Sequence, residues 1–186
     1  MEEEIERTLE VLKKGGIILY PTDTVWGIGC DATNAEAVKR IYALKQREET
    51  KSMIVLMNSD RMMYRVFKDI PEVAWQIIDL SEKPTTLILD NPRNVAPNLI
   101  APDKTLGVRL VKEHFCFKLM ERMKNPLVST SANISGMPTP NSFKEIDHHI
   151  LDGVDYIVNL HHNKIAAKPS TIIKLGNNLQ VKVIRP

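Results

Sequence analysis

The sequence predicts an α/β fold in which a twisted, mixed β-sheet is covered by helices. Short apolar runs that suit buried strands alternate along the chain with longer stretches whose apolar residues recur at helical spacing. The 186 residues, 43% hydrophobic and 26% charged, suffice to bury one substantial core. Because no repeat, low-complexity tract or linker interrupts the pattern, we expect one domain over residues 1–186.

Six stretches have the apolar spacing of a helix face. In the first, Ile5 and Leu9 share a face, and two glycines at 15–16 supply a stop. In the second, the Asn34 side chain can cap the first turn, and the helix ends near Lys45. The expected helices cover residues 2–14, 35–45, 60–67, 72–80, 114–123 and 142–151.

Eight apolar runs are typical of short strands. They cover residues 17–20, 52–57, 85–89, 107–111, 127–130, 156–160, 171–175 and 179–184. Pro21 is expected to break the first strand, because proline cannot donate a backbone hydrogen bond. The segment 91–104 contains three prolines and three asparagines, so we expect a long loop. Such a loop either presents residues to a ligand or simply crosses the surface, and both interpretations stay open.

Charge, cysteine content and hydropathy indicate the cellular compartment and the classes of partner to expect. A formal net charge of +2 is too small to indicate a nucleic-acid partner by itself, although a basic face can exist within it. Cys30 and Cys116 lack CxxC spacing, which favours a reducing, cytoplasmic setting. The acidic residues 2–4 are unlike a signal peptide. Because no apolar run approaches the roughly 20 residues of a membrane span, no membrane association is expected.

Two polar segments together indicate a nucleoside triphosphate site. Lys45 and Arg47, with Lys51 four residues further on, can neutralise several phosphate oxygens. Ser131 and Asn133 follow an expected strand and offer hydrogen bonds without adding charge. By itself, the cationic segment is more often the exposed C-terminal end of a helix, where the helix dipole favours positive charge.

The segment 20–27 places Thr22, Asp23 and Thr24 directly after a strand. Two hydroxyls and a carboxylate in one turn can hold a small zwitterion, or they can merely satisfy the backbone of the turn. The position at the carboxyl end of a strand favours ligand binding. The small polar residues 129–133 likewise permit close approach of a ligand.

Several other patterns are set aside on spacing. Residues 27–32 fit the G-x-G-x-x-A dinucleotide fingerprint, but six residues separate Tyr20 from Gly27, whereas the fingerprint needs a glycine directly after the strand. The sequence has no P-loop motif, and Ser131 lacks the context of a hydrolase nucleophile. The histidine pairs 148–149 and 161–162 lack zinc-site spacing, so no metal site is expected and they are interpreted as exposed and idle. Four methionines are interpreted as core filling: Met53, Met57, Met62 and Met63.

Five segments carry a common signature: Tyr-Pro-Thr-Asp-Thr-x-x-Gly at 20–27, Lys-x-Arg at 45–47, Gly-Val-Arg at 107–109, Ser-x-Asn at 131–133 and Pro-Ser-Thr-Ile at 169–172. In this order and spacing the chain resembles the YrdC/TsaC family, in its short single-domain form. The resemblance implies a YrdC-like fold and a nucleotidyltransferase that makes threonylcarbamoyl-AMP and pyrophosphate from L-threonine, bicarbonate or CO₂, and ATP, with Mg²⁺ accompanying ATP. It also implies tRNA-modification proteins as recipients of the adenylate, while direct tRNA contact stays open.

The resemblance also implies roles for individual residues. Threonine would contact Thr24, Arg109, Ser129 and Ser170. ATP would contact Arg47, Lys51, Thr105, Ser131, Thr139 and Arg185, and the catalytic signature would be Lys45, Arg47, Ser131 and Asn133. This division fits the chemistry, because a carboxylate suits the bidentate fork of arginine and a triphosphate needs more than one cation. The chain departs from many relatives at Glu48, where proline is frequent, at Leu56, where some have histidine, and at Lys168, where arginine is common.

Two other functions remain as alternatives. An RNA-binding module of the same fold without synthase activity is one, although 5% aromatic residues argues against base stacking as its main mode. An NAD-dependent enzyme, implied by the glycine pattern at 27–32, is the other.

Overall fold

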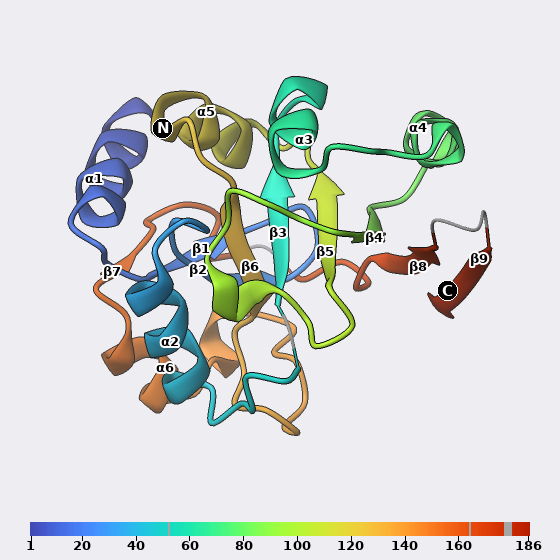
Figure 1. Cartoon of the computed structure of the whole chain (residues 1–186). Coiled ribbons are helices and arrows are strands. Elements are labelled where there is room, and N and C mark those ends of the chain that lie inside the picture. The colour runs from blue at the N-terminus through green and yellow to red at the C-terminus, as the bar shows by residue number, and fades with distance from the viewer. Residues whose placement is uncertain (52, 164, 177–179) are drawn as a thin grey trace.

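The computed structural model describes residues 1–51, 53–163, 165–176 and 180–186. Within these ranges it contains one mixed sheet of nine strands flanked by helices, which confirms the predicted fold class (Figure 1). The helices are α1 (Glu2–Lys13), α2 (Ala35–Leu44), α3 (Asp60–Val66), α4 (Glu72–Leu80), α5 (His114–Met123) and α6 (His148–Gly153), with short 3-10 helices η1 (Pro97–Leu99) and η2 (Phe143–Glu145). The strands are β1 (Ile18–Pro21), β2 (Trp26–Gly29), β3 (Ile54–Met57), β4 (Thr85–Asp90), β5 (Thr105–Leu110), β6 (Leu127–Ser131), β7 (Tyr156–Ile157), β8 (Thr171–Leu175) and β9 (Val181–Arg185).

The strand order places the polar segments side by side. The sheet runs β7-β1-β2-β6-β3-β5-β4-β8-β9, with parallel pairs β1–β7, β3–β5 and β4–β8 and antiparallel pairs elsewhere. Gly27 of β2 lies opposite Ser131 of β6. The turn between β1 and β2 therefore lies beside the end of β6, although more than a hundred residues separate them in the chain.

Strand β2 was not expected from the sequence, and its two glycines explain why. A Cβ atom on Gly29 would lie 2.8 Å from Cε1 of Tyr20 and 2.4 Å from the Val128 carbonyl oxygen. Glycine is therefore needed for Tyr20 to pack across β2, where its hydroxyl donates to Val128 O at 3.2 Å. Since residues 26–29 are extended, Gly27 and Gly29 cannot form the turn of a dinucleotide site.

Other boundaries differ less. The expected helix 142–151 is divided into η2 and α6, because the Asp147 side chain accepts from the backbone N–H of His149 and caps a new helix there. The expected strand 156–160 is paired only over β7, and β1 continues through Pro21, which lies opposite Trp26. Ser52 and Leu179, where two strands were expected to begin, lie outside the described residues.

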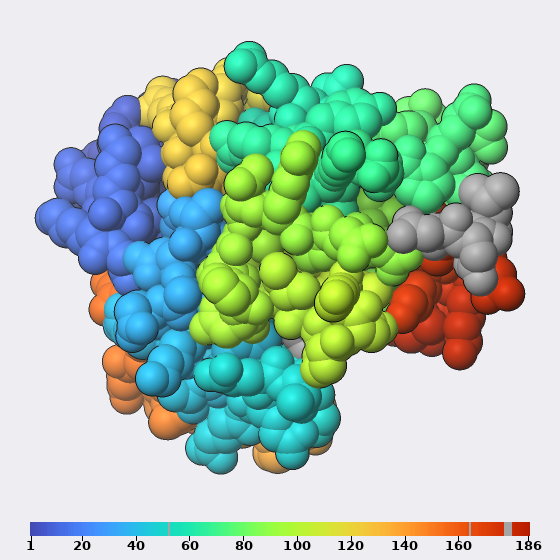
Figure 2. Space-filling model, in the orientation of Figure 1, coloured from blue at the N-terminus to red at the C-terminus, as the bar shows by residue number. Residues whose placement is uncertain are grey.

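The loop 91–104 crosses the surface and is fixed there by packing. Figure 2 shows it spread across the centre of one face. Ala96 and Leu99 are buried, Ala96 N–H donates to Ala32 O, and the Tyr42 hydroxyl of α2 donates to Asn98 O. Of the two open interpretations, the structure therefore favours the surface crossing.

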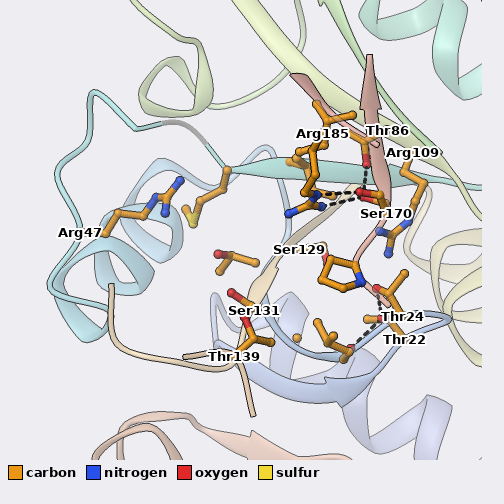
Figure 3. Close-up of a pocket in the computed structure, with 17 residues that line it drawn as sticks. Thr22, Thr24, Arg47, Thr86, Arg109, Ser129, Ser131, Thr139, Ser170 and Arg185 are labelled. Carbon is orange, nitrogen blue, oxygen red and sulfur yellow. Dashed lines mark hydrogen bonds between the residues drawn. The ribbon is translucent and has the colours of Figure 1, made fainter. Parts of the chain in front are cut away.

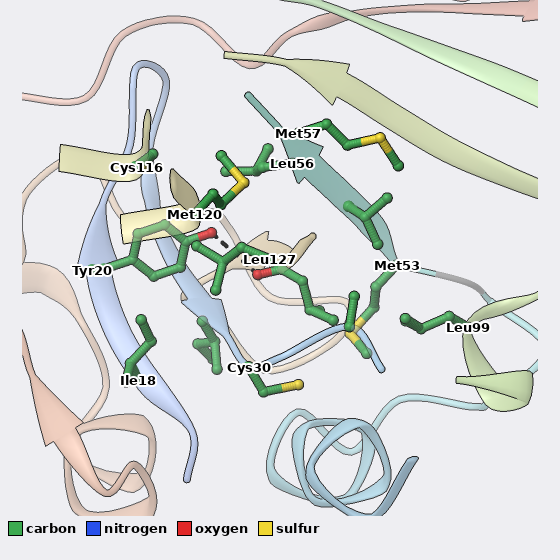
Figure 4. Close-up of a cluster of buried hydrophobic side chains, with 14 of the residues drawn as sticks. Ile18, Tyr20, Cys30, Met53, Leu56, Met57, Leu99, Cys116, Met120 and Leu127 are labelled. Carbon is green, nitrogen blue, oxygen red and sulfur yellow. Dashed lines mark hydrogen bonds between the residues drawn. The ribbon is translucent and has the colours of Figure 1, made fainter. Parts of the chain in front are cut away.

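The core lies between the sheet and its helices (Figure 4). The four methionines expected to fill the core are buried there, as are the free thiols of Cys30 and Cys116. Burial raises the pKa of the Cys116 thiol well above its ordinary value. Among the described helices none has the length and apolar character needed to cross a membrane.

Candidate active site

A cavity of about 240 Å³ opens where the β1–β2 turn and strands from both halves of the chain meet (Figure 3). Three arginines and many hydroxyl groups line it, and among the described residues no Asp or Glu does. The lining residues are Thr22, Thr24, Val25, Gly27, Arg47, Met53, Ile54, Thr86, Arg109, Ser129, Thr130, Ser131, Thr139, Pro169, Ser170, Ile172 and Arg185. Such a lining favours a ligand that is both anionic and rich in hydrogen-bonding groups.

Arg109 is the most buried cation of the cavity. It lies on β5, its side chain is 4% exposed, and its Nη2 donates to the Asp23 carboxylate at 2.8 Å. Its Nε is buried without a hydrogen-bond partner. Asp23 belongs to the β1–β2 turn, so the hairpin fixes the plane of the guanidinium group. One ion pair uses part of a five-donor fork and leaves the rest for a ligand.

Arg185 reaches the same cavity from β9. Its Nε donates to Ser170 O at 2.8 Å and its Nη2 to Ser170 Oγ at 3.3 Å. The Ser170 hydroxyl in turn shares a hydrogen bond of 2.9 Å with Thr86 Oγ1. Burial, and then the positive charge of Arg109, lower the pKa of Arg185. Two guanidinium groups that repel each other across a cavity are stabilised by an anion between them.

The hydroxyl groups of the β1–β2 turn satisfy the backbone of the turn and also face the cavity. The Thr22 hydroxyl donates to Val25 O at 2.7 Å and accepts from Thr24 N–H at 3.0 Å. The two threonine hydroxyls lie 3.0 Å apart. These bonds stabilise the turn, and both side chains also line the cavity.

Lys45 does not lie on an exposed helix end, which corrects the sequence-based interpretation. It is 1% exposed, and its Nζ donates at 2.5 Å both to Ser131 O and to Asn133 O. Burial, and secondarily the charge of Arg47, lower its pKa to about 7. Lys45 therefore joins the end of α2 to the end of β6 and the residues after it. The sequence could not show this, because the two partners lie 86 and 88 residues away.

Most of the predicted site residues come together. Those lining the cavity are Thr24, Arg47, Arg109, Ser129, Ser131, Thr139, Ser170 and Arg185. Four others do not line it. Lys45 is buried outside the lining, and Asn133 lines a neighbouring cavity of about 260 Å³ that Thr139 also lines. Lys51 is exposed and ion-paired with Glu48 at 3.3 Å. The fourth, Thr105, donates to Asp103 at 2.7 Å.

Sequence reasoning missed several contacts. Thr86 and Ile54 lie within expected strands, and nothing in the pattern marked them as facing a cavity. Asp23 was noted as a ligand group, whereas it holds Arg109. Leu56 is buried away from the cavity, and Lys168 is exposed.

The histidines are not all idle, contrary to expectation. The ring of His162 stacks on Phe143, and His149 Nε2 donates to Leu44 O at 3.1 Å. Within the described ranges, no group of three or more His, Cys, Asp or Glu side chains could hold a metal ion.

The mixed sheet and its arginine-lined cavity define an α/β protein suited to an anionic ligand held beside hydroxyl groups. The protein-family model Sua5_yciO_yrdC, described as "Telomere recombination", matches residues 10–186. The chain therefore belongs to the Sua5/YciO/YrdC family, as the resemblance predicted.

Similar proteins extend along most of the chain. A putative threonylcarbamoyl-AMP synthase of Methanocaldococcus jannaschii is 35% identical over 98% of this chain and 87% of its own length. The threonylcarbamoyl-AMP synthase of Pseudomonas aeruginosa is 31% identical over 80% of each chain. A variant of Pyrococcus abyssi Sua5 superposes with a TM-score of 0.89 over 100% of this chain, and the complex of Sua5 with L-threonine with 0.79 over 94%, both at 28% identity. This chain spans 57% and 52% of those two structures.

Proposed function

We propose that this protein is an L-threonylcarbamoyl-AMP synthase, a nucleotidyltransferase that forms threonylcarbamoyl-AMP and pyrophosphate from L-threonine, bicarbonate or CO₂, and ATP. Relatives that match most of the chain carry this name, and a family structure was solved with L-threonine. These names favour the synthase over an RNA-binding module of the same fold. Strand β2 at residues 26–29 removes the basis for an NAD enzyme, because its glycines are extended.

The observation that carries the proposal is the composition of the cavity. Arg47, Arg109 and Arg185 all line it, and no acidic side chain of the described residues does. Asp23 pairs with Arg109, but burial and then the charge of Arg109 still lower the pKa of Arg185, so an anionic ligand would be stabilised between the two arginines and a neutral one would not. A carboxylate together with a polyphosphate supplies the opposite charge at more than one point, as threonine and ATP do.

Threonine is proposed to bind at the end formed by Thr24, Arg109, Ser129 and Ser170. Arg109 is buried and oriented by Asp23, so its remaining donors can bind the carboxylate in a charge-assisted pair. The hydroxyls of Thr24, Ser129 and Ser170 can exchange hydrogen bonds with the threonine hydroxyl and with the carbamate.

ATP is proposed to bind at the end formed by Arg47, Ser131, Thr139 and Arg185. Arg47 Nε donates to Lys51 O at 2.6 Å, and this bond orients the Arg47 side chain along the 47–51 turn. Lys51 has an exposed ion pair with Glu48 that costs little to break, so its ammonium can reach a bound phosphate. Thr105 lies outside the cavity lining, so it would contact ATP only if the bound nucleotide extends beyond that lining.

The reaction needs no side-chain nucleophile. The threonine amine attacks the carbon of CO₂ and loses a proton, which gives a carbamate. A carbamate oxygen then attacks the α-phosphorus of ATP, the bond to the bridging oxygen breaks, and pyrophosphate leaves with that electron pair. Arginines and hydroxyls already in place align the two substrates and stabilise the charge that develops on the phosphates.

Mg²⁺ is proposed to enter as part of the ATP substrate. The cavity lining offers it no carboxylate from the described residues, so its ligands would be phosphate oxygens and water. Lys45 and Asn133 are proposed to act indirectly, by holding the backbone next to Ser131.

The product is proposed to pass to tRNA-modification proteins in the cytoplasm. A mixed anhydride of a carbamate and a phosphate is reactive toward water and amines, so a consuming reaction must follow closely. Direct contact with tRNA is a separate question that filter binding over a salt series would answer.

A pyrophosphate-release assay tests the proposal. ATP, Mg²⁺ and bicarbonate would be supplied with threonine, with serine or with no amino acid. We expect release that depends on threonine. Salt-sensitive tRNA binding without threonine-dependent release would instead support the RNA-binding module.

A further inference from the structure

Three aromatic rings form a cluster next to the proposed active site but outside its lining. The rings of Phe143 and His162 are stacked, with centroids 4.1 Å apart and an interplanar angle of 9°. Trp26 contacts both, with centroids 5.0 Å from Phe143 and 5.5 Å from His162. These residues come from η2, from β2 and from the connection between β7 and β8.

The imidazole ring of His162 is held at its face by stacking and at its edge by a hydrogen bond. Its Nε2 carries the proton, because it donates at 3.0 Å to the Val158 carbonyl, which can only accept. A ring with one fixed nitrogen and a stacked face has a defined orientation. It therefore anchors the start of the β7–β8 connection to η2.

The same connection makes two backbone contacts with segments of the site. Ala166 N–H donates to Asn141 O at 2.7 Å, and Ala167 N–H donates to Thr24 O at 2.8 Å. Three residues later the connection places Ser170 in the cavity. Ala166 also faces the β1–β2 turn across a small pocket of about 10 Å³.

We infer that His162 is a positioning residue for the threonine end of the site. Its stack on Phe143 fixes residue 162 of the β7–β8 connection, whose later residues support Thr24 through Ala167 and carry Ser170. Of the residues assigned to ATP, Arg47 and Ser131 belong to other segments, whereas Arg185 is held by Ser170. Loss of the stack should therefore disturb threonine more than ATP. This inference rests on the proposed function for its kinetic readout.

The test compares His162→Ala, His162→Phe and His148→Ala. An aromatic pair is worth enough that His162→Ala should raise the KM for threonine roughly 3- to 10-fold, with a smaller rise in the KM for ATP through Arg185. It should also speed hydrogen exchange at the Ala167 amide. His162→Phe keeps the aromatic face and should restore most of both properties. His148 is exposed at the start of α6, so His148→Ala is the matched control.

Two results would overturn the inference. One is an unchanged KM for threonine together with unchanged exchange at Ala167 in His162→Ala. The other is an equal rise in both KM values with a lower melting temperature that His162→Phe fails to restore, because that indicates a general loss of structure. If the wild-type protein released no threonine-dependent pyrophosphate, the proposed function would fail, and Ala167 exchange would still decide whether His162 anchors the connection.

Discussion

At the scale of single residues, the site depends on cations that the fold holds in place. Asp23 orients Arg109, Ser170 orients Arg185, and the 47–51 turn orients Arg47. The guanidinium groups of Arg109 and Arg185 retain donors beyond those their protein partners use. The arrangement before any ligand arrives is thus already close to what a carboxylate and a polyphosphate require.

Arg109→Lys should lower kcat/KM for threonine about 10- to 100-fold, because an ammonium keeps the charge but loses the fork that binds Asp23 and a carboxylate together. Initial rates of pyrophosphate release at varied threonine would measure this. Arg61→Lys, on the exposed face of α3, should leave the rate unchanged. Equal activity of Arg109→Lys and wild type would remove Arg109 from the carboxylate.

Arg47→Ala should lower kcat about 100-fold or more, because a charge-stabilising donor is lost from the proposed phosphate end. The fold should stay intact, which circular dichroism would check. An unchanged rate of pyrophosphate release would exclude Arg47 from this role.

At the scale of elements, local signals fixed most boundaries and tertiary packing decided the exceptions. The expected helices 72–80 and 114–123 and the strand 171–175 match the structure, because apolar spacing is strong there and polar residues bound them. Strand β2 escaped prediction because its glycines are needed by Tyr20, which is a distant contact. Lys45 was misplaced for the same reason. Its partners belong to β6 and the residues after it, which no periodicity in α2 can reveal.

Gly29→Ala tests the packing of β2. The added methyl group would meet backbone at 2.4 Å, so we expect a loss of about 3 kcal/mol in the free energy of unfolding. Gly27→Ala, whose nearest neighbour would be Thr22 Cγ2 at 3.3 Å, should cost clearly less. Urea denaturation would measure both. Similar losses at the two positions would contradict this account.

Gln46→Gly tests the end of α2. Gln46 has a φ of 50°, and Arg47 N–H donates to Tyr42 O, so the helix ends with a residue in the left-handed region. Glycine adopts that region without steric cost, and we expect a gain of about 0.5–1 kcal/mol in unfolding free energy. Gln46→Ala should change stability little, and a loss of stability in Gln46→Gly would refute the interpretation.

At the scale of the whole molecule, one cavity joins residues from Thr22 to Arg185, so its geometry depends on the complete sheet. Lys45 links this geometry to overall stability. Its lowered pKa of about 7 means that, between pH 7 and 10.5, the unfolded chain binds more protons at this position than the folded protein does. Stability should therefore rise with pH through that window, while below pH 7 the cost of burying the charge is fully present.

Lys45→Met should flatten this dependence by up to about 1.4 kcal/mol per pH unit between pH 7 and 10. Urea denaturation at several pH values would measure the slope, which the loss of two hydrogen bonds alone does not change. The exposed Lys144→Met should retain the wild-type slope. Parallel curves for Lys45→Met and wild type would contradict the lowered pKa.

Strand β9 closes one edge of the sheet and is paired there with β8. Because Arg185 extends from this outermost strand into the cavity, filling the cavity and ordering the margin of the sheet are thermodynamically coupled. A bound nucleotide should slow hydrogen exchange along β9. If a peptide paired with the outer edge of β9, it would change the affinity for nucleotide by the same factor by which nucleotide changes the affinity for the peptide.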